Sequence, residues 1–217
     1  MSLNVFPAFA VPMAEAFHPE PDGLNRELLA LIRVLEAQGA AHRNPDPVVH
    51  QPDGLYESDF NFFARQEPCV AALRTWVWSQ LGDFLRNINP GMANGFGGLR
   101  VASQTWFHLT RTGGYFGYHN HPMASWSGVY CVSDGQPDPA YRNNGCLVFP
   151  HPQPAVNTFL DPANAELRWP FTHGNFVLTP TPGKLVLFPS WLGHYVTPFR
   201  GDGERVTVAF IAWFTRD

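Results

Sequence analysis

The chain has 217 residues, of which 45% are hydrophobic and 15% charged, and its net charge is −4. This length fits one domain that can bury a full core without disulfide bonds. The sequence contains few charged residues and no cluster of lysine and arginine, which argues against nucleic acid or a membrane surface as a partner. No apolar run reaches 18 residues, so no membrane span is expected.

The cysteines and the N-terminus indicate the cellular compartment. Cys69, Cys131 and Cys146 are odd in number and form no CxxC pair. This pattern argues against a disulfide framework and a cysteine zinc site, and favours a reducing compartment. The N-terminus lacks a basic stretch followed by an apolar core, so no signal peptide is expected. We therefore predict a cytoplasmic protein.

The first part of the chain predicts two amphipathic helices. Residues 24–38 carry leucine and isoleucine at helical spacing, and Gly39 follows as a stop signal. Residues 68–88 repeat the helical period and begin with Pro68, which suits a first helical turn. Both apolar faces are expected to pack on a sheet.

The pattern changes after Asn94-Gly95. Short β-branched and aromatic runs follow, divided by the turn-forming residues in which the chain is rich, with 21 prolines and 19 glycines. The predicted strands lie near residues 102–110, 127–133, 145–149, 184–188, 193–197 and 205–214. Residues 150–176 are proline-rich and predict a long ordered loop of the kind that often borders an active site.

Many short strands separated by turns predict a sandwich or barrel. Neither part of the chain can bury its apolar face alone, so a single domain spanning residues 1–217 is expected. In this domain residues 1–93 form a helical support, and residues 94–217 form the β core.

Two of the nine histidines stand in the pattern His119-Asn-His121. On an extended chain the side-chain period is two, so both imidazoles point to the same face. Two neutral imidazoles on one face can clamp a borderline divalent metal ion. Six other histidines, among them His108, have no partner at ligand spacing and are expected to be structural or exposed.

His194 is the candidate for a third ligand. It follows the segment Gly183-Lys-Leu-Val-Leu-Phe-Pro189-Ser-Trp-Leu-Gly, which reads as a turn, a buried strand and a sharp turn. A buried strand that leads to a histidine is how a barrel would supply a further ligand. The alternative is a histidine that caps a turn.

Arg205 and Thr207 share one face of the last predicted strand. If that face lies inside the barrel, the guanidinium group is buried and requires an anionic partner. An arginine fork with a hydroxyl group two residues on suits a carboxylate. The alternative is a solvated edge arginine or one paired with Asp202 or Glu204.

Residues 113–214 resemble the Fe(II)- and 2-oxoglutarate-dependent oxygenases. The matching segments are HNHPMASWSGVYCV, beginning at His119, and GKLVLFPSWLGHYVTPFRGDGERVTVAF, beginning at Gly183. The order of features also agrees: an HxH pair, a strand, a long insert, a distal histidine, and an arginine about ten residues on. Within this superfamily the chain is similar to a group found in marine bacteria and phages.

The resemblance implies a mainly β fold, a double-stranded β-helix or jelly roll packed against the N-terminal helices. It implies a dioxygenase that hydroxylates a substrate. Fe(II) would be bound by His119, His121 and His194, and the distal carboxylate of 2-oxoglutarate by Arg205 and Thr207. One departure is that His121 stands where the superfamily has an aspartate or glutamate ligand, so the site has one negative charge fewer.

The expected partner is a small-molecule or peptide substrate, with no nucleic acid and no membrane, and a homodimer is allowed. Nearby aromatic side chains are candidates for the pocket wall, although ordinary core packing explains each of them equally well. These residues are Tyr115, Tyr118, Trp126, Tyr130 and Trp191.

Two alternative functions remain open. A cupin-type metalloenzyme would use the same three histidines without 2-oxoglutarate, and the spacing from Gly113 to His119 and from Gly183 to His194 suits the cupin motifs. The cupin glutamate after HxH is missing, however, and cupins have no need of Arg205. A non-catalytic metal-binding jelly-roll module would show no oxygen uptake with any co-substrate.

Overall fold

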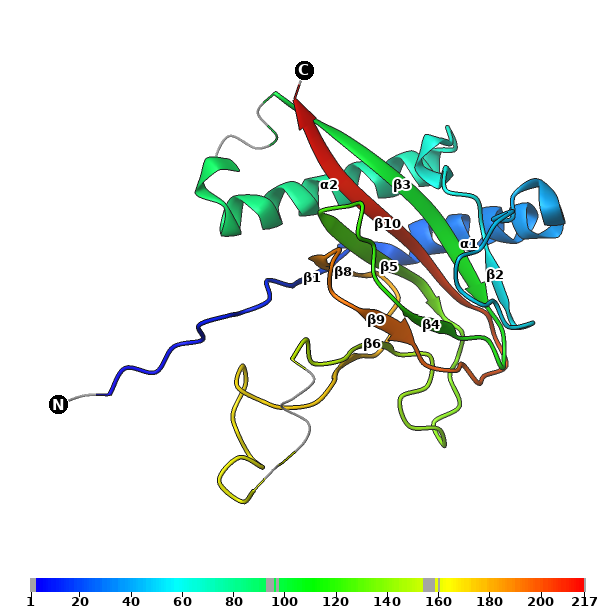
Figure 1. The fold of residues 1–217 in the computed structure, drawn as a ribbon. Coiled ribbons are helices and arrows are strands. Elements are labelled where there is room, and N and C mark those ends of the chain that lie inside the picture. Colours follow the sequence, from blue (N-terminus) through cyan, green and yellow to red (C-terminus); the bar gives the residue numbers. More distant parts are fainter. Residues whose placement is uncertain (1–2, 93–95, 97, 154–158, 160, 217) are drawn as a thin grey trace.

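Two antiparallel β-sheets face each other in the computed structural model, which describes residues 3–92, 96, 98–153, 159 and 161–216 (Figure 1). The larger sheet has the order β1 (Ala14–Phe17), β8 (Lys184–Pro189), β5 (Trp126–Asp134), β10 (Arg205–Arg216), β3 (Leu99–Thr110), β2 (Leu55–Glu57). The smaller has the order β4 (Phe116–His119), β9 (His194–Val196), β6 (Leu147–Phe149), β7 (Phe176–Leu178). The fold is a double-stranded β-helix, as expected.

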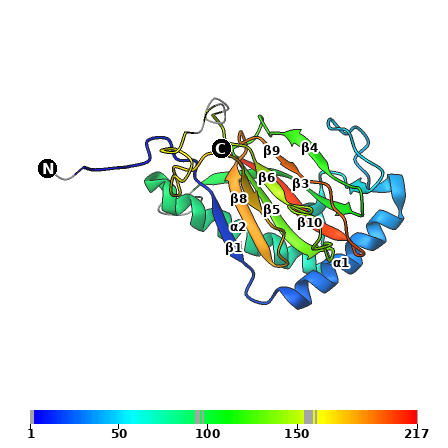
Figure 2. The ribbon, with the colours of Figure 1, turned by 90° about the horizontal axis from the view of Figure 1, so that it is seen from below.

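Two helices cover the outer face of the larger sheet, α1 (Pro21–Ala37) and α2 (Pro68–Ile88) (Figures 1 and 2). The main hydrophobic core lies between these helices and β3, β5, β8 and β10. Three short 3₁₀ turns complete the described elements: η1 (Gly39–Ala41), η2 (Phe62–Ala64) and η3 (Pro90–Met92). No described helix is long and apolar enough to cross a membrane.

Both predicted helices are present. α2 has the predicted bounds, and α1 begins three residues earlier than predicted because Pro21 occupies its first turn. Gly39 follows α1 with a φ of +62°, a conformation that favours glycine and ends the helical run.

All six predicted strands are confirmed, with shifted ends. Four strands were not predicted: β1, β2, β4 and β7. Each has only three or four residues, too few to establish a period of two. Two of them, β1 and β2, place edge strands within residues 1–93, beside the helices. Asn94, Gly95 and part of the predicted loop 150–176 lie outside the described residues.

The central strand β10 divides its side chains between the two sides of the larger sheet. Val206 and Val208 pack into the core beneath the helices. Arg205 and Thr207, at the alternate positions, line a pocket between the two sheets. The period of two thus places the predicted co-substrate residues inside the barrel.

Candidate metal centre

His119 and His194 lie opposite each other because β4 and β9 pair antiparallel. His119, the last residue of β4, is the register partner of His194, the first residue of β9. The centroids of their rings are 4.2 Å apart. The strand pairing thus places two imidazoles together that are far apart in the sequence.

His121 completes the cluster from the segment after β4. Its backbone N–H donates to the Ser190 carbonyl over 2.8 Å, which ties this segment to the end of β8. The ring centroid of His121 lies 4.9 Å from that of His119 and 5.3 Å from that of His194. One nitrogen of each ring lies within 4.8 Å of the others, and among the described residues no carboxylate joins this group.

Backbone carbonyl groups fix the orientation of two of the rings. Nδ1 of His119 donates to the Gly117 carbonyl over 2.8 Å, and Nδ1 of His194 donates to the Leu192 carbonyl over 2.9 Å. A carbonyl oxygen can only accept, so Nδ1 carries the proton and Nε2 keeps a free lone pair. Such bonds to the outer nitrogen are typical of metal-ligating histidines.

Burial keeps the three imidazoles neutral. Loss of solvent lowers the pKa of His119, lowers the pKa of His121 to about 4 and lowers that of His194 to about 3, and the neighbouring imidazoles add to the effect. Neutral imidazole is the form that binds a metal ion, so no proton has to leave at neutral pH.

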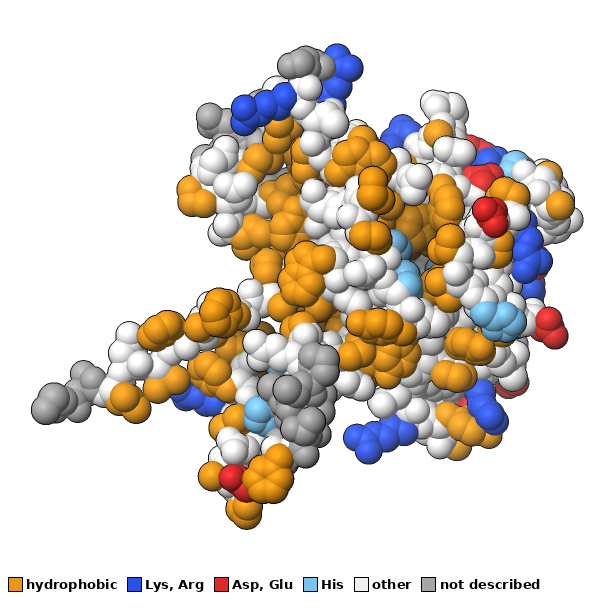
Figure 3. Space-filling view, in the orientation of Figure 1, with side chains coloured by type: hydrophobic (Ala, Val, Ile, Leu, Met, Phe, Trp, Pro, Cys, Tyr) orange, Lys and Arg blue, Asp and Glu red, His pale blue; other side chains and the backbone are white. Residues whose placement is uncertain are grey.

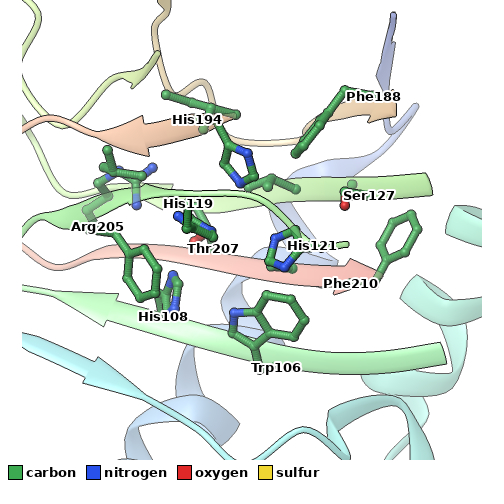
Figure 4. Close-up of a pocket in the computed structure, with 16 residues that line it drawn as sticks. Trp106, His108, His119, His121, Ser127, Phe188, His194, Arg205, Thr207 and Phe210 are labelled. Atoms are coloured by element: carbon green, nitrogen blue, oxygen red, sulfur yellow. The ribbon is translucent and has the colours of Figure 1, made fainter. Parts of the chain in front are cut away.

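Arg205 and Thr207 line the same pocket as the three histidines (Figure 4). Arg205 is 3% exposed, and its Nε donates to the Gly145 carbonyl over 2.8 Å. None of the described carboxylates forms an ion pair with Arg205. The adjacent Glu204 pairs with Arg33 and Arg111 instead. Burial lowers the pKa of the Arg205 guanidinium, which nevertheless stays charged at neutral pH. The pocket therefore holds a buried cation with hydrogen-bonding capacity to spare.

Gly145 is a site residue that the sequence analysis missed. Its φ is +62°, and a Cβ there would lie 3.1 Å from Cδ of Arg205. A side chain would therefore press on the arginine whose Nε the Gly145 carbonyl holds. The run Asn143-Asn144-Gly145 was the available signal, since such residues favour a left-handed turn.

His108 has a closer relation to the site than its sequence spacing indicated. It is buried in β3, lines the pocket, and its Nε2 lies 2.8 Å from Oε2 of Glu57 in β2. Its ring stacks on Phe116 with a centroid distance of 4.7 Å. His108 is thus paired and structural, as expected, but it is also part of the pocket wall.

Several of the aromatic residues proposed for the wall lie elsewhere. Trp126 packs edge-to-face on Phe84 of α2, and Tyr130 packs on Trp76 in the same way. The side chains of Trp126 and Tyr130, at even-numbered positions of β5, point toward the helices. The side chains of the odd-numbered Ser127 and Val129 therefore face the pocket. The aromatic side chains that do line the pocket are Trp106, Phe116, Phe188 and Phe210.

The chemistry of these groups fits Fe(II) and 2-oxoglutarate. Three converging imidazole nitrogens suit Fe(II) as well as other first-row metal ions. A buried guanidinium without an anionic side chain, in the same pocket, suits the far carboxylate of a dicarboxylate. The donor set therefore accommodates both groups.

Comparisons with known proteins agree with this geometry. The model of the family described as "Putative 2OG-Fe(II) oxygenase" matches residues 104–210, about half of the chain. Among curated proteins no sequence matches. A prolyl-4-hydroxylase of Pseudomonas putida is structurally similar with a TM-score of 0.58 and 19% identity, covering 95% of this chain and 94% of that one.

Two further solved structures have the same fold. HygX of Streptomyces hygroscopicus, crystallised with nickel, 2-oxoglutarate and hygromycin B, has a TM-score of 0.54 at 14% identity, over 93% of this chain and 82% of its own. The non-heme alpha-ketoglutarate-dependent carbocyclase SnoK of nogalamycin biosynthesis has a TM-score of 0.59 at 12% identity, over 93% and 79%.

The matched segment contains all three clustered histidines, Arg205 and Thr207. The chain belongs to the family of Fe(II)- and 2-oxoglutarate-dependent oxygenases, and Fe(II) and 2-oxoglutarate are its metal ion and co-substrate.

Proposed function

We propose that His119, His121 and His194 bind the Fe(II) of a dioxygenase that hydroxylates its substrate, and that Arg205 and Thr207 bind the distal carboxylate of 2-oxoglutarate. The observation that carries the proposal is that one pocket holds three converging neutral imidazoles and a buried guanidinium without a carboxylate partner among the described residues. A cupin-type site would not need that guanidinium.

When bound, Fe(II) and 2-oxoglutarate supply the oxidising power for oxygen insertion, with dioxygen consumed and 2-oxoglutarate converted to succinate and carbon dioxide. The chain provides binding and orientation. The Gly145 carbonyl holds Nε of Arg205, which leaves the terminal nitrogens of the guanidinium for a carboxylate. The Thr207 hydroxyl lies on the same face, two residues along β10, and can donate to the same carboxylate.

The apolar wall of the pocket keeps bulk water away from the reacting groups. Phe188 packs edge-to-face on His194 with a centroid distance of 4.8 Å, and Phe149 lies 5.7 Å from the same ring. Exclusion of water strengthens the electrostatic interactions of Arg205 and protects reactive species from side reactions.

The rim of the site favours a substrate with an apolar surface, either a small molecule or a peptide. Tyr118, Met123 and Trp191 lie within three residues of a proposed ligand histidine in the sequence and are 68%, 85% and 54% exposed. In Figure 3 histidine side chains are visible in a hollow bordered by hydrophobic side chains. Exposed apolar groups beside a pocket are typical of a binding surface.

The experiment that tests the proposal is an anaerobic titration of the Fe(II)-loaded protein with 2-oxoglutarate, followed by the visible charge-transfer absorption of the complex. We expect a band that grows to saturation in the wild type. Arg205→Ala should weaken 2-oxoglutarate binding at least tenfold, because a charge-assisted bidentate contact is lost.

The matched control is Arg216→Ala, which removes an exposed arginine from the far end of the same strand and should bind 2-oxoglutarate like the wild type. Arg205→Lys should bind with intermediate affinity, since it keeps the charge and loses the fork. A protein that binds iron without developing the band, or an Arg205→Ala variant with wild-type affinity, would overturn the assignment.

A further inference from the structure

We infer that Trp106 is a positioning residue for 2-oxoglutarate, and that its indole N–H donates a hydrogen bond to an oxygen at the metal-binding end of the co-substrate. The inference rests on the proposed function, since it assumes that the pocket binds 2-oxoglutarate between the three histidines and Arg205. Arg205 and Thr207 would bind the distal carboxylate of 2-oxoglutarate, and Trp106 would contact the opposite end of the molecule.

The observation behind the inference is a buried donor without a partner. Trp106 is 6% exposed and lines the pocket. Its Nε1 is the one fully buried side-chain polar atom in the described part of the chain that has no hydrogen-bond partner. Buried N–H groups in native proteins are nearly always satisfied, so a donor left over inside a binding pocket points to a ligand.

The indole cannot easily turn to find a partner within the protein. Trp106 is register-paired with Ala209 in the middle of the β3–β10 ladder. The ring of Phe60 packs edge-to-face on the indole at 5.2 Å, and His121 lies on it at 5.6 Å. Sheet pairing and ring packing together hold the donor in place, which is the condition for a positioning group.

The direction of the indole favours the co-substrate over the primary substrate. In Figure 4 the nitrogen of Trp106 lies on the side of the ring that is turned toward His108, the side of the pocket where Arg205 also lies. Tyr118 and Trp191, the exposed residues of the rim, do not line the pocket. In this view the donor is turned toward the part of the pocket that His108 and Arg205 line.

The chemistry of 2-oxoglutarate suits this donor. The carboxylate and the keto oxygen next to each other at one end of the molecule only accept hydrogen bonds. A hydrogen bond from a neutral N–H to an ionised carboxylate is stronger than one between neutral groups. His108, the neighbouring polar residue of this wall, is engaged at Nε2 by Glu57, whereas the indole N–H of Trp106 has no hydrogen-bond partner among the described residues.

The test is NMR of the indole groups in ¹⁵N-labelled, Zn(II)-loaded protein titrated with 2-oxoglutarate. The Trp106 signal is assigned by its absence in Trp106→Phe and, independently of that variant, by triple-resonance experiments on the wild type. We expect the Trp106 indole proton to move downfield as 2-oxoglutarate saturates the protein, because it gains a charged acceptor.

The second measurement is the affinity of Fe(II)-loaded Trp106→Phe for 2-oxoglutarate in the anaerobic titration. It should fall on the order of tenfold to a hundredfold, the effect of one hydrogen bond to a charged group. Trp213→Phe, which alters a tryptophan of the same apolar cluster, is the control and should keep the wild-type affinity.

The outcomes separate this inference from the proposed function. If 2-oxoglutarate binds in an Arg205-dependent way while the Trp106 proton stays in place, or if Trp106→Phe binds with wild-type affinity, the role of Trp106 is refuted and the proposed site stands. If the wild type does not bind 2-oxoglutarate, the proposed site fails, and the role of Trp106 fails with it.

Discussion

At the scale of single residues, Glu57 shows how a buried carboxylate can organise a pocket wall without binding the metal. Its oxygens accept hydrogen bonds from Asn44 over 2.6 Å and Gln51 over 2.9 Å, and lie 2.8 Å from Nε2 of His108. Burial raises the pKa of Glu57, but the hydrogen bonds from His108 and Asn44 and the His108 charge outweigh burial and lower the pKa below its ordinary value.

Glu57→Gln should destabilise the fold by about 1–3 kcal/mol at neutral pH, because the amide nitrogen replaces an acceptor and faces another donor. Since the pKa of Glu57 is lowered in the folded state, its contribution is present above the ordinary value of 4.5 and is lost as the pH falls. The difference in unfolding free energy between wild type and variant should therefore shrink toward pH 4.

Urea melts at several pH values measure this difference. Glu27→Gln, at an exposed position of α1, is the control and should differ little from the wild type at any pH. A Glu57→Gln variant as stable as the wild type at neutral pH would contradict the role of this network.

At the scale of elements, a glycine in β5 makes room for an aromatic ring of the neighbouring strand β10. Gly128 of β5 is the register partner of Phe210 in β10, whose ring passes over the glycine. A Cβ at position 128 would lie 2.3 Å from the Phe210 ring and 3.0 Å from Leu187 of β8. The absence of a side chain thus lets the Phe210 ring pack in the core between the larger sheet and the helices, edge-to-face on Trp78 of α2 with a centroid distance of 5.0 Å.

Gly128→Ala should destabilise the protein by about 1–3 kcal/mol, because the added methyl group forces Phe210 out of its place. Thermal unfolding of the metal-free protein measures this effect. Phe210→Leu combined with Gly128→Ala should recover part of the loss, because the smaller side chain makes room for the methyl group. A single Gly128→Ala variant with unchanged stability would show that the ring relaxes without cost.

At the scale of the whole molecule, the proposed metal ligands join segments that are far apart in sequence. His119 and His121 come from β4 and the segment after it, and His194 comes from β9. A metal ion that binds all three would stabilise the native state, because the unfolded chain does not hold the ligands together.

Zn(II) or Ni(II) at a hundred times its dissociation constant should stabilise the wild type by about 2.7 kcal/mol, roughly 5–10 °C in Tm for a chain of this size. His194→Ala should lose most of this shift, and the exposed His50→Ala should keep it. Differential scanning fluorimetry with and without metal measures the shifts. Equal stabilisation of His194→Ala and wild type would place the metal elsewhere.

The sequence by itself determined the features that depend on local periodicity. The bounds of α2 and the placement of Arg205 and Thr207 on one face of β10 follow from side-chain periods of 3.6 and 2. The HxH spacing kept His119 and His121 close in the chain, although β4 ends at His119 and His121 lies in the segment after it. The segments that resemble the family were recognisable because each of them is continuous in the chain.

Only the tertiary structure decided which distant residues meet. The register of β4 with β9 brings His194 to His119, the register of β2 with β3 brings Glu57 to His108, and the turn at Gly145 reaches Arg205. These contacts depend on strand register and on backbone carbonyl groups, and neither leaves a periodic signal in the sequence. For the same reason the unpaired indole of Trp106 became apparent only when its surroundings were known.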